Sequence, residues 1–210
     1  MNFVVGMLLS VFHRDDDGGA DEESAFWLLC AMVEVYMPTM YVPTLLGAKL
    51  ECTVLKTLVG ISLPALSVHL EREGLPLDLV VTEWFFALFS SSFPPHVTAR
   101  CWDLFFFYGM TALQWVALGH LHRCSLELDG SESFETLLAV IKDTMQCEHD
   151  ADRILYFALM YMERFSPPYM AQLVASIEDR LKGNAVLSLE RTLASDIMPA
   201  ITSTVRKSGA

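Results

Sequence analysis

The sequence predicts an all-α protein, and three observations indicate this fold class. Apolar residues recur at the spacing of one helix face in segment after segment, and no stretch alternates apolar and polar residues as a strand would. Prolines and glycines separate these segments at intervals of about one helix length. Of the 210 residues, 53% are apolar and 19% are charged, which is enough apolar side chain for a large helical core.

The amino-terminal part of the chain predicts two helices separated by an acidic loop. The first helix, at residues 2–12, is almost wholly apolar and begins without a capping residue. Asp21, Glu22 and Glu23 are expected in the first turn of the second helix, because carboxylates stabilise the positive end of a helix dipole. This helix continues over residues 25–36 and is apolar on most faces, so we expect it in the core. The acidic loop lacks the alternating ligands of a calcium loop, which indicates a solvated segment.

Prolines and glycines also mark the next two helices. Pro38 and Pro43 break the chain into a connecting segment, after which a helix passes through residues 50–58. Pro64 starts the following helix, because proline suits the first helical turn, and Gly74 is placed to end it.

Residues 82–109 form the densest apolar run and predict two helices joined by a short break. The first carries an aromatic stripe over residues 84–89, and a run of serines then weakens it. The Pro94-Pro95 pair fixes φ and lacks amide donors, so the second helix begins there. Gly109 is placed to end the second helix.

Three neighbouring residues in the second of these helices combine charge and bulk. Arg100 and Asp103 lie one turn apart on the same side and can form an ion pair, while Trp102 points into apolar surroundings. We interpret the group as a structural ion pair beside a core tryptophan. Truncating a buried tryptophan and leaving a charge unpaired both destabilise a protein, so we expect alanine at Trp102 or Arg100 to lower stability.

Five further helices are predicted toward the carboxyl end. An acidic turn at Asp129-Gly130 precedes the second of them, which Ser131 or Ser133 can cap. The Pro167-Pro168 pair starts the fourth, and Gly183-Asn184 is expected to stop it before a last, weakly amphipathic helix. The five helices are expected at residues 110–123, 134–145, 154–162, 167–181 and 186–205.

The charge balance argues against two classes of partner. The formal net charge is −12, with 26 acidic and 14 basic residues, so the field of the protein opposes nucleic acid and anionic membrane surfaces. The five cysteines are odd in number and widely spaced, which favours reduced thiols in a cytoplasmic protein. The amino-terminal apolar run has no basic residue before it and therefore differs from a signal peptide.

A helical membrane protein is one alternative that the sequence raises. The run from Leu104 to His122 contains no Asp, Glu, Lys or Arg and is about as long as a bilayer span. It also contains Gly109, Gln114 and His120, and no cluster of Lys or Arg flanks it to set an orientation. We therefore expect no transmembrane segment.

The sequence contains no standard enzyme signature. It has no Gly-rich phosphate loop, no Gly-x-Ser-x-Gly, no His-Glu-x-x-His and no Cys-x-x-Cys. His120, His122 and Cys124 alternate, but positions i and i+2 of a helix point in different directions, so we expect no zinc site there. His69 is interpreted as a packing or capping residue. We assign no catalytic residue and expect no cofactor or metal.

A pattern of Trp-Phe, Leu-Phe, Pro, Arg-x-Trp-Asp-Leu-Phe and Gly runs through residues 84–109. The pattern resembles the second half of the TBC domain, the module of Rab GTPase-activating proteins, and we interpret its residues as structural. They are Trp84, Phe85, Leu88, Phe89, Pro94, Arg100, Trp102, Asp103, Leu104, Phe105 and Gly109. Similar residues precede them in the family's order, at Phe26-Trp27, Leu46-Gly47, Pro64, His69-Leu70 and Gly74.

The resemblance implies an all-helical, TBC-like domain that acts on a Rab small GTPase. It covers roughly residues 1–125, as the C-terminal portion of a partial TBC domain. Residues 126–205 are expected to be a helical continuation or extension, and residues 206–210 a flexible tail. GTP and Mg²⁺ belong to the partner, so the resemblance implies a GTPase activator rather than an enzyme. It further implies a role in vesicle traffic, with peripheral association with endomembranes through the partner.

The finger motifs of the family do not occur in the 210 residues. TBC domains supply an arginine finger in Ile-x-x-Asp-x-x-Arg and a glutamine finger in Tyr-x-Gln, directly before Gly-Met. Residues 1–6 resemble the continuation of the second motif. We therefore expect both fingers upstream of residue 1 in a longer gene, and a chain that is catalytically incomplete as written. A TBC domain that lacked the part before residue 1 would leave core-facing side chains such as Phe3, Val4, Met7 and Leu8 without part of their packing.

A non-catalytic scaffold is the other alternative. Such a protein would bind a small GTPase or another partner through the same helices without accelerating hydrolysis. Measuring GTPase binding and GTP turnover separately distinguishes it from an activator.

Overall fold

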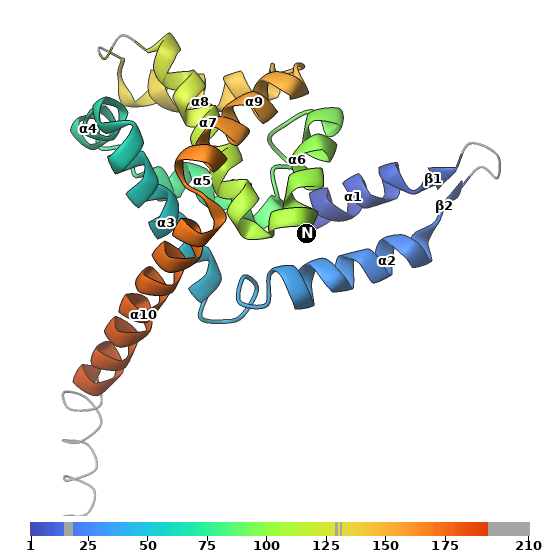
Figure 1. Cartoon of the computed structure of the whole chain (residues 1–210), viewed down its shortest axis with the longest axis horizontal. Coiled ribbons are helices and arrows are strands. Elements are labelled where there is room, and N and C mark those ends of the chain that lie inside the picture. The colour runs from blue at the N-terminus through green and yellow to red at the C-terminus, as the bar shows by residue number, and fades with distance from the viewer. Residues whose placement is uncertain (15–18, 129, 131, 193–210) are drawn as a thin grey trace, which may run out of the picture.

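The computed structural model describes residues 1–14, 19–128, 130 and 132–192 (Figure 1). These residues are almost wholly helical, which confirms the predicted fold class. The helices are α1 Asn2–Val11, α2 Glu22–Ala31, the π-helix η1 Met32–Tyr36, α3 Leu46–Ser62, α4 Pro64–Arg72, α5 Leu77–Ala87, α6 Pro95–Tyr108, α7 Met110–Glu127, α8 Phe134–Gln146, α9 Ala151–Arg164 and α10 Pro167–Thr192.

Helix α7 is the core element of the body of the molecule, which α3 to α9 form (Figure 1). All of its residues from 112 to 121 are buried. It packs closely on α9 at Gly119, where a Cβ atom would lie only 2.9 Å from the Cβ of Phe157. A side chain at position 119 would therefore force α9 away from α7. Side chains of α8, α9 and α10 share this core, and the division of the chain near residue 125 stays a prediction.

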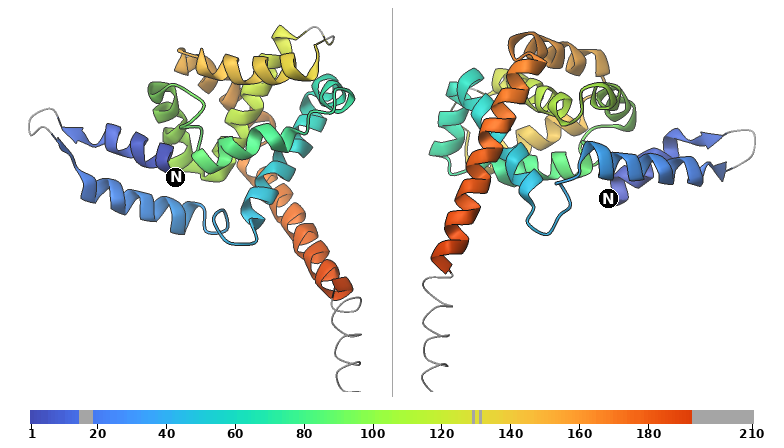
Figure 2. Two further views of the ribbon diagram at one scale, coloured as in Figure 1. Left: turned by 180° about the vertical axis from the view of Figure 1, so that it is seen from behind. Right: turned by 60° about the horizontal axis from the view of Figure 1, so that its bottom comes forward.

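Helices α1 and α2 form an arm that projects from the body (Figures 1 and 2). Two short antiparallel strands, β1 His13–Arg14 and β2 Gly19–Ala20, pair at its tip. The sequence gives no sign of these strands, because a two-residue strand is too short to show period-two alternation. Asp21 caps α2 by accepting a hydrogen bond from the Ser24 amide over 3.0 Å.

The prediction that the helix after the acidic loop lies in the core is wrong for α2. Only Ala25 of α2 is buried, and the side chains of Phe26 and Trp27 are 56% and 63% exposed. These side chains are exposed because α2 lies on the projecting arm, where it packs on α1 and has no other described element against its outer face (Figure 2). The π-helix that follows returns to the body, where Met32 is fully buried.

The first helix is better packed than the sequence suggests. Val4, Met7 and Leu8 are buried, whereas Phe3 is 62% exposed. The expectation of incomplete packing therefore fails for three of the four side chains and fits only Phe3. The three buried side chains lie at helical spacing, so they share the side of α1 that packs on the rest of the molecule.

The predicted helix starts and stops at Pro64, Gly74 and Gly109 are confirmed. Pro64 is the first residue of α4, and Gly74 and Gly109 have φ angles of 68° and 65°. Leu45 precedes α3 in the left-handed region with φ of 50°. Gly47 then passes so close to Thr39 that a Cβ would lie 2.7 Å from its backbone carbonyl. A glycine is thus required at Gly47 by space rather than by φ.

The carboxyl-terminal helices differ from prediction in two places. Helix α10 continues through Gly183-Asn184 to Thr192, so the predicted stop is wrong. A glycine inside a helix costs only about 1 kcal/mol, which the neighbouring turns can offset. Ser133 is the N-cap residue of α8, but its hydroxyl contacts Glu135 and Thr136 rather than a backbone amide. Ser131, the end of the last predicted helix and the predicted tail lie outside the described residues.

No single helix of the described residues is long and apolar enough to cross a membrane, although α3 and α4 pass that test together across a 116° bend.

Candidate functional site

The signature motifs fold into α5, α6 and the turn that joins them. Helix α5 ends at Ala87, and Leu88 and Phe89 then adopt left-handed backbone angles, with φ of 49° and 64°. Both side chains are fully buried. The predicted aromatic stripe therefore continues from a helix into a turn. Left-handed geometry is unfavourable for residues with a side chain, so surrounding contacts must hold this turn in place.

Trp102 provides the clearest of these contacts. Its indole Nε1–H donates a hydrogen bond to the carbonyl oxygen of Leu88 over 2.8 Å, and the side chain is only 3% exposed. Thr98, one turn earlier in α6, donates from its hydroxyl to the carbonyl oxygen of Phe93 over 3.3 Å. Trp102 is thus a core residue, as predicted, and it ties α6 to the strained turn.

The aromatic signature residues of α5 pack on the same turn. Phe85 is 1% exposed, and the ring of Trp84 lies 5.8 Å from the ring of Phe89. Pro94 is extended, with φ of −56° and ψ of 149°, and places Pro95 as the first residue of α6. These positions confirm the predicted helix break and show why bulky residues surround it.

Arg100 and Asp103 form the predicted ion pair, with 2.6 Å between Nη1 and Oδ2. Their side chains are 55% and 62% exposed, so the pair lies on the surface rather than in the core. Exposed pairs contribute about 0–1 kcal/mol, because water screens both charges. The loss expected on removing Arg100 is therefore at most about 1 kcal/mol, rather than the large loss of a buried pair.

Gly109 sets the angle between α6 and α7. Its φ of 65° and ψ of −151° lie in a region that is essentially restricted to glycine. Its amide donates to the carbonyl oxygen of Phe105 over 2.8 Å, which closes the last turn of α6. The signature glycine therefore has a direct backbone role.

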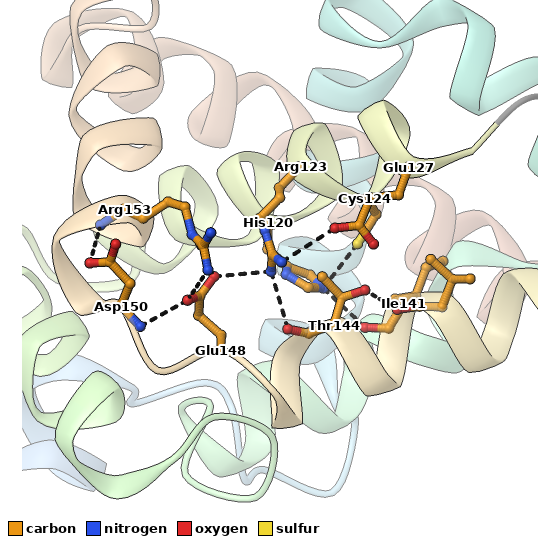
Figure 3. Close-up of polar contacts among 10 residues, drawn as sticks. His120, Arg123, Cys124, Glu127, Ile141, Thr144, Glu148, Asp150 and Arg153 are labelled. Carbon is orange, nitrogen blue, oxygen red and sulfur yellow. Dashed lines mark hydrogen bonds and ion pairs between the residues drawn. The ribbon is translucent and has the colours of Figure 1, made fainter.

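A second polar cluster joins α7 to the segment between α8 and α9 (Figure 3). The Glu148 side chain is 0% exposed and binds two arginines. Its carboxylate accepts hydrogen bonds from Arg153 over 2.6 and 3.1 Å and from the Asp150 amide over 2.9 Å. Arg123 of α7 lies 3.0 Å from the same carboxylate. Every oxygen of this buried carboxylate thus has a partner.

These partners determine the ionisation of Glu148. Burial by itself raises the pKa of a carboxyl group, but the hydrogen bonds from Arg153 and the Asp150 amide and the charge of Arg123 favour the ionised form. The net result is that the pKa of Glu148 is lowered from its ordinary value of 4.5. Glu148 is therefore a buried carboxylate that holds three segments of the chain together.

We expect Glu148→Ala to lower the free energy of unfolding by about 1.5–3 kcal/mol, the typical value of charge-assisted hydrogen bonds. Because the folded pKa is lowered, this contribution is complete above the ordinary value of 4.5 and is lost as the pH falls below it. Urea denaturation at pH 7 and at pH 4 measures both effects. Glu127→Ala is the matched control, since Glu127 pairs with the same Arg123 but is 49% exposed. Equal losses in both variants would contradict a special role for Glu148.

His120, His122 and Cys124 do not converge on one point. The Sγ of Cys124 lies 3.3 Å from Nε2 of His120, which is also 3.0 Å from the carbonyl oxygen of Ile141. His122 points elsewhere and bonds the hydroxyl of Tyr161 over 3.0 Å. Burial lowers the pKa of His120 to about 4, so the ring is neutral near pH 7. No group of three potential metal ligands occurs among the described residues.

The sequence offers no signal for the Glu148 cluster. Glu148 lies in a short polar break between two helices, where a solvated side chain is the ordinary expectation. Its arginine partners come from elements on both sides of it, and helical periodicity does not relate such positions.

His69 is buried as predicted, and its Nε2 lies 3.1 Å from the carbonyl oxygen of Glu132.

Two curated relatives match most of the chain. Growth hormone-regulated TBC protein 1 of Xenopus laevis is 31% identical over 163 residues, which cover 78% of this chain and 46% of the relative. Small G protein signaling modulator 3 of Homo sapiens is 34% identical over 140 residues, which cover 66% of this chain and 19% of the relative. The chain thus spans less than half the length of these relatives.

The fold and a family model agree with these similarities. The crystal structure of the Chlamydomonas flagellar RabGAP TBC domain superposes with a TM-score of 0.65 at 29% identity, covering 77% of this chain and 52% of that one. The family model described as the Rab-GTPase-TBC domain matches residues 1–128, which include α1 to α7 and every signature residue of the α5–α6 turn. On these grounds the chain belongs to the Rab-GTPase-TBC domain family.

Proposed function

We propose that this chain binds a Rab-family small GTPase and contributes the helical scaffold of a GTPase-activating protein. The match of residues 1–128 to the Rab-GTPase-TBC family is the observation that carries the proposal. The turn between α5 and α6 supports the proposal, because the signature residues Trp84 and Trp102 both contact it. The chemistry of GTP hydrolysis takes place in the partner, which holds the nucleotide and Mg²⁺.

Two catalytic contributions come from an activator of this kind. An arginine neutralises the charge that develops on the transferred phosphoryl group, and a glutamine orients the attacking water. Neither motif that carries these residues in the family occurs in the sequence. Arg100 is a poor substitute, because its guanidinium is already bound to Asp103 over 2.6 Å. The 210 residues therefore supply a binding scaffold rather than transition-state contacts.

The place of action follows from the partner. With a Rab GTPase as partner, the chain would work in the cytoplasm and reach endomembranes through that partner. Its net charge of −12 opposes direct attraction to anionic lipid surfaces, which favours this indirect route.

We expect the 210-residue chain to bind at least one Rab in a nucleotide-dependent manner. Immobilised Rab proteins loaded with a non-hydrolysable GTP analogue or with GDP test this by biolayer interferometry. The GTP form is expected to bind more tightly, since an activator must recognise the state that precedes hydrolysis. A small GTPase of another family is the specificity control, and the destabilised Trp102→Ala chain shows whether binding requires the fold. Failure to bind any Rab, or equal binding of both nucleotide states, would contradict the proposal.

A further inference from the structure

A buried carboxyl group meets an amide where α3 packs on α7. Glu51 of α3 is 8% exposed, and Gln114 of α7 is 0% exposed. The Nε2 of Gln114 donates one hydrogen bond to the Glu51 carboxyl oxygen Oε2 over 2.5 Å and another to the Glu51 backbone carbonyl oxygen over 3.1 Å. The contact joins residues that are 63 positions apart in the sequence.

No ion pair neutralises Glu51 among the described residues. The lysines of its own helix, Lys49 and Lys56, are exposed. Lys182 of α10 is bound to Glu178 over 2.6 Å, and Arg72 of α4 is bound to Glu73 over 2.8 Å. A buried carboxylate without a cation is unfavourable, because the protein interior solvates the charge poorly.

Other titratable groups around α3 do not change this balance. Asp78 of α5 is itself acidic. Burial is the main reason why the pKa of the neighbouring Cys52 is raised, and the charges of Asp78 and Glu51 raise it further. On α7, His120 is fully buried and bonded to Ile141 rather than to Glu51. Within the side chains that the structure describes, helices α4, α5 and α10 also carry His69, Glu71, Glu83, Tyr169, Asp179 and Arg180.

The contact also has more acceptors than donors. Both Gln114 hydrogens are used, while its Oε1 is buried and has no hydrogen-bond partner. The carboxylate form of Glu51 offers only acceptors, whereas the protonated form adds an O–H donor and removes the charge. The geometry therefore fits a neutral carboxylic acid better than a carboxylate.

We propose that Glu51 is a proton-dependent contact between α3 and α7, neutral in mildly acidic solution and ionised in mildly alkaline solution, where its charge weakens the packing of the two helices. Burial raises the pKa of Glu51 from 4.5 to about 7, against the smaller opposing effect of the Gln114 hydrogen bond. Because the folded pKa is the higher one, the folded state retains the proton more strongly. Stability from this group is complete below pH 4.5 and decreases as the pH rises through about 7.

Glu51→Gln tests the proposal, because glutamine has the same shape and mimics the neutral acid. We expect the parent and the Gln variant to melt at similar temperatures at pH 5. At pH 8 the variant should be more stable, by a factor on the order of a hundred in the unfolding equilibrium. That factor corresponds to about 5–10 °C in melting temperature for a chain of this size. Calorimetry of the full chain from pH 5 to pH 8 gives the comparison.

Two controls separate Glu51 from other titrations. The exposed residue Glu83 on α5 provides the matched variant Glu83→Gln, which should leave the pH profile unchanged. His120, whose pKa is lowered to about 4, favours folding as the pH rises, but it is present in every chain compared. Carboxyl ¹³C NMR of labelled protein should show a glutamate that titrates near pH 7 and disappears in Glu51→Gln. A difference in melting temperature that does not change with pH, or titration of Glu51 near the ordinary glutamate value, would overturn the proposal.

Discussion

Replacing Trp102 with alanine is expected to lower the free energy of unfolding by about 3–5 kcal/mol, the usual cost of removing a buried tryptophan. The side chain is 3% exposed and also donates the indole hydrogen bond to Leu88, whose backbone is left-handed with φ of 49°. The substitution therefore opens a cavity and releases a strained turn in one step. Typical domains have only about 5–15 kcal/mol of stability, so this substitution is expected to remove a large share of it.

Two further variants identify the origin of this loss. Trp102→Phe keeps most of the apolar contact but removes the indole donor, so it should cost less than Trp102→Ala and more than a surface change. Arg100→Ala removes only the exposed pair with Asp103 and should cost at most about 1 kcal/mol. Urea denaturation followed by circular dichroism gives all three values. If Trp102→Ala had the denaturation midpoint of the parent chain, Trp102 could not be the residue that holds the α5–α6 turn.

Helix boundaries were the most predictable part of the fold, because proline and glycine act on the local backbone. Pro64 and Pro95 begin helices where their missing amide hydrogens are not needed, and Gly74 and Gly109 end segments with positive φ. The exception is Gly183, which α10 passes without a break. A glycine with ordinary helical neighbours is a weak signal, since about 1 kcal/mol is easily offset.

Burial was less predictable, because it depends on what covers a helix face. The apolar pattern of α2 resembles that of a core helix, yet Phe26 and Trp27 are more than half exposed on the arm. Conversely, Glu51 and Glu148 are buried although both carry a carboxyl group. Each of these outcomes is set by residues that are distant in sequence or by the direction in which an element leaves the body. Helical periodicity contains neither kind of information.

In the candidate site, too, local features were predictable from the sequence and long-range contacts were not. The spacing of Arg100 and Asp103 predicted their ion pair, and the apolar neighbours of Trp102 predicted its burial. Spacing alone did not reveal that the pair is exposed, that the tryptophan bonds the Leu88 carbonyl, or that Leu88 and Phe89 form a left-handed turn. The family resemblance located the signature correctly, whereas the physical role of each residue required the structure.

The 210-residue chain is expected to leave the GTP hydrolysis rate of a bound Rab within about tenfold of its intrinsic value. A missing arginine finger alone is worth about 10³–10⁵ in rate, because the charge on the transferred phosphoryl group is then not neutralised. Among the described side chains, Arg100 is the exposed arginine in the signature helix, and it is engaged with Asp103. Single-turnover hydrolysis with a fluorescent phosphate sensor measures the rate at saturating chain concentration.

The controls make this rate measurement decisive. A TBC domain that contains both finger motifs, assayed with the same Rab, must give the full acceleration. Saturable binding of the 210-residue chain in the same samples must show that any lack of acceleration is not a lack of contact. Arg100→Ala and Arg14→Ala test whether an arginine of the signature helix or the arginine of strand β1 acts as a finger. Acceleration well above tenfold that either substitution abolishes would show that this chain supplies its own finger, and the assignment of a binding scaffold would then be wrong.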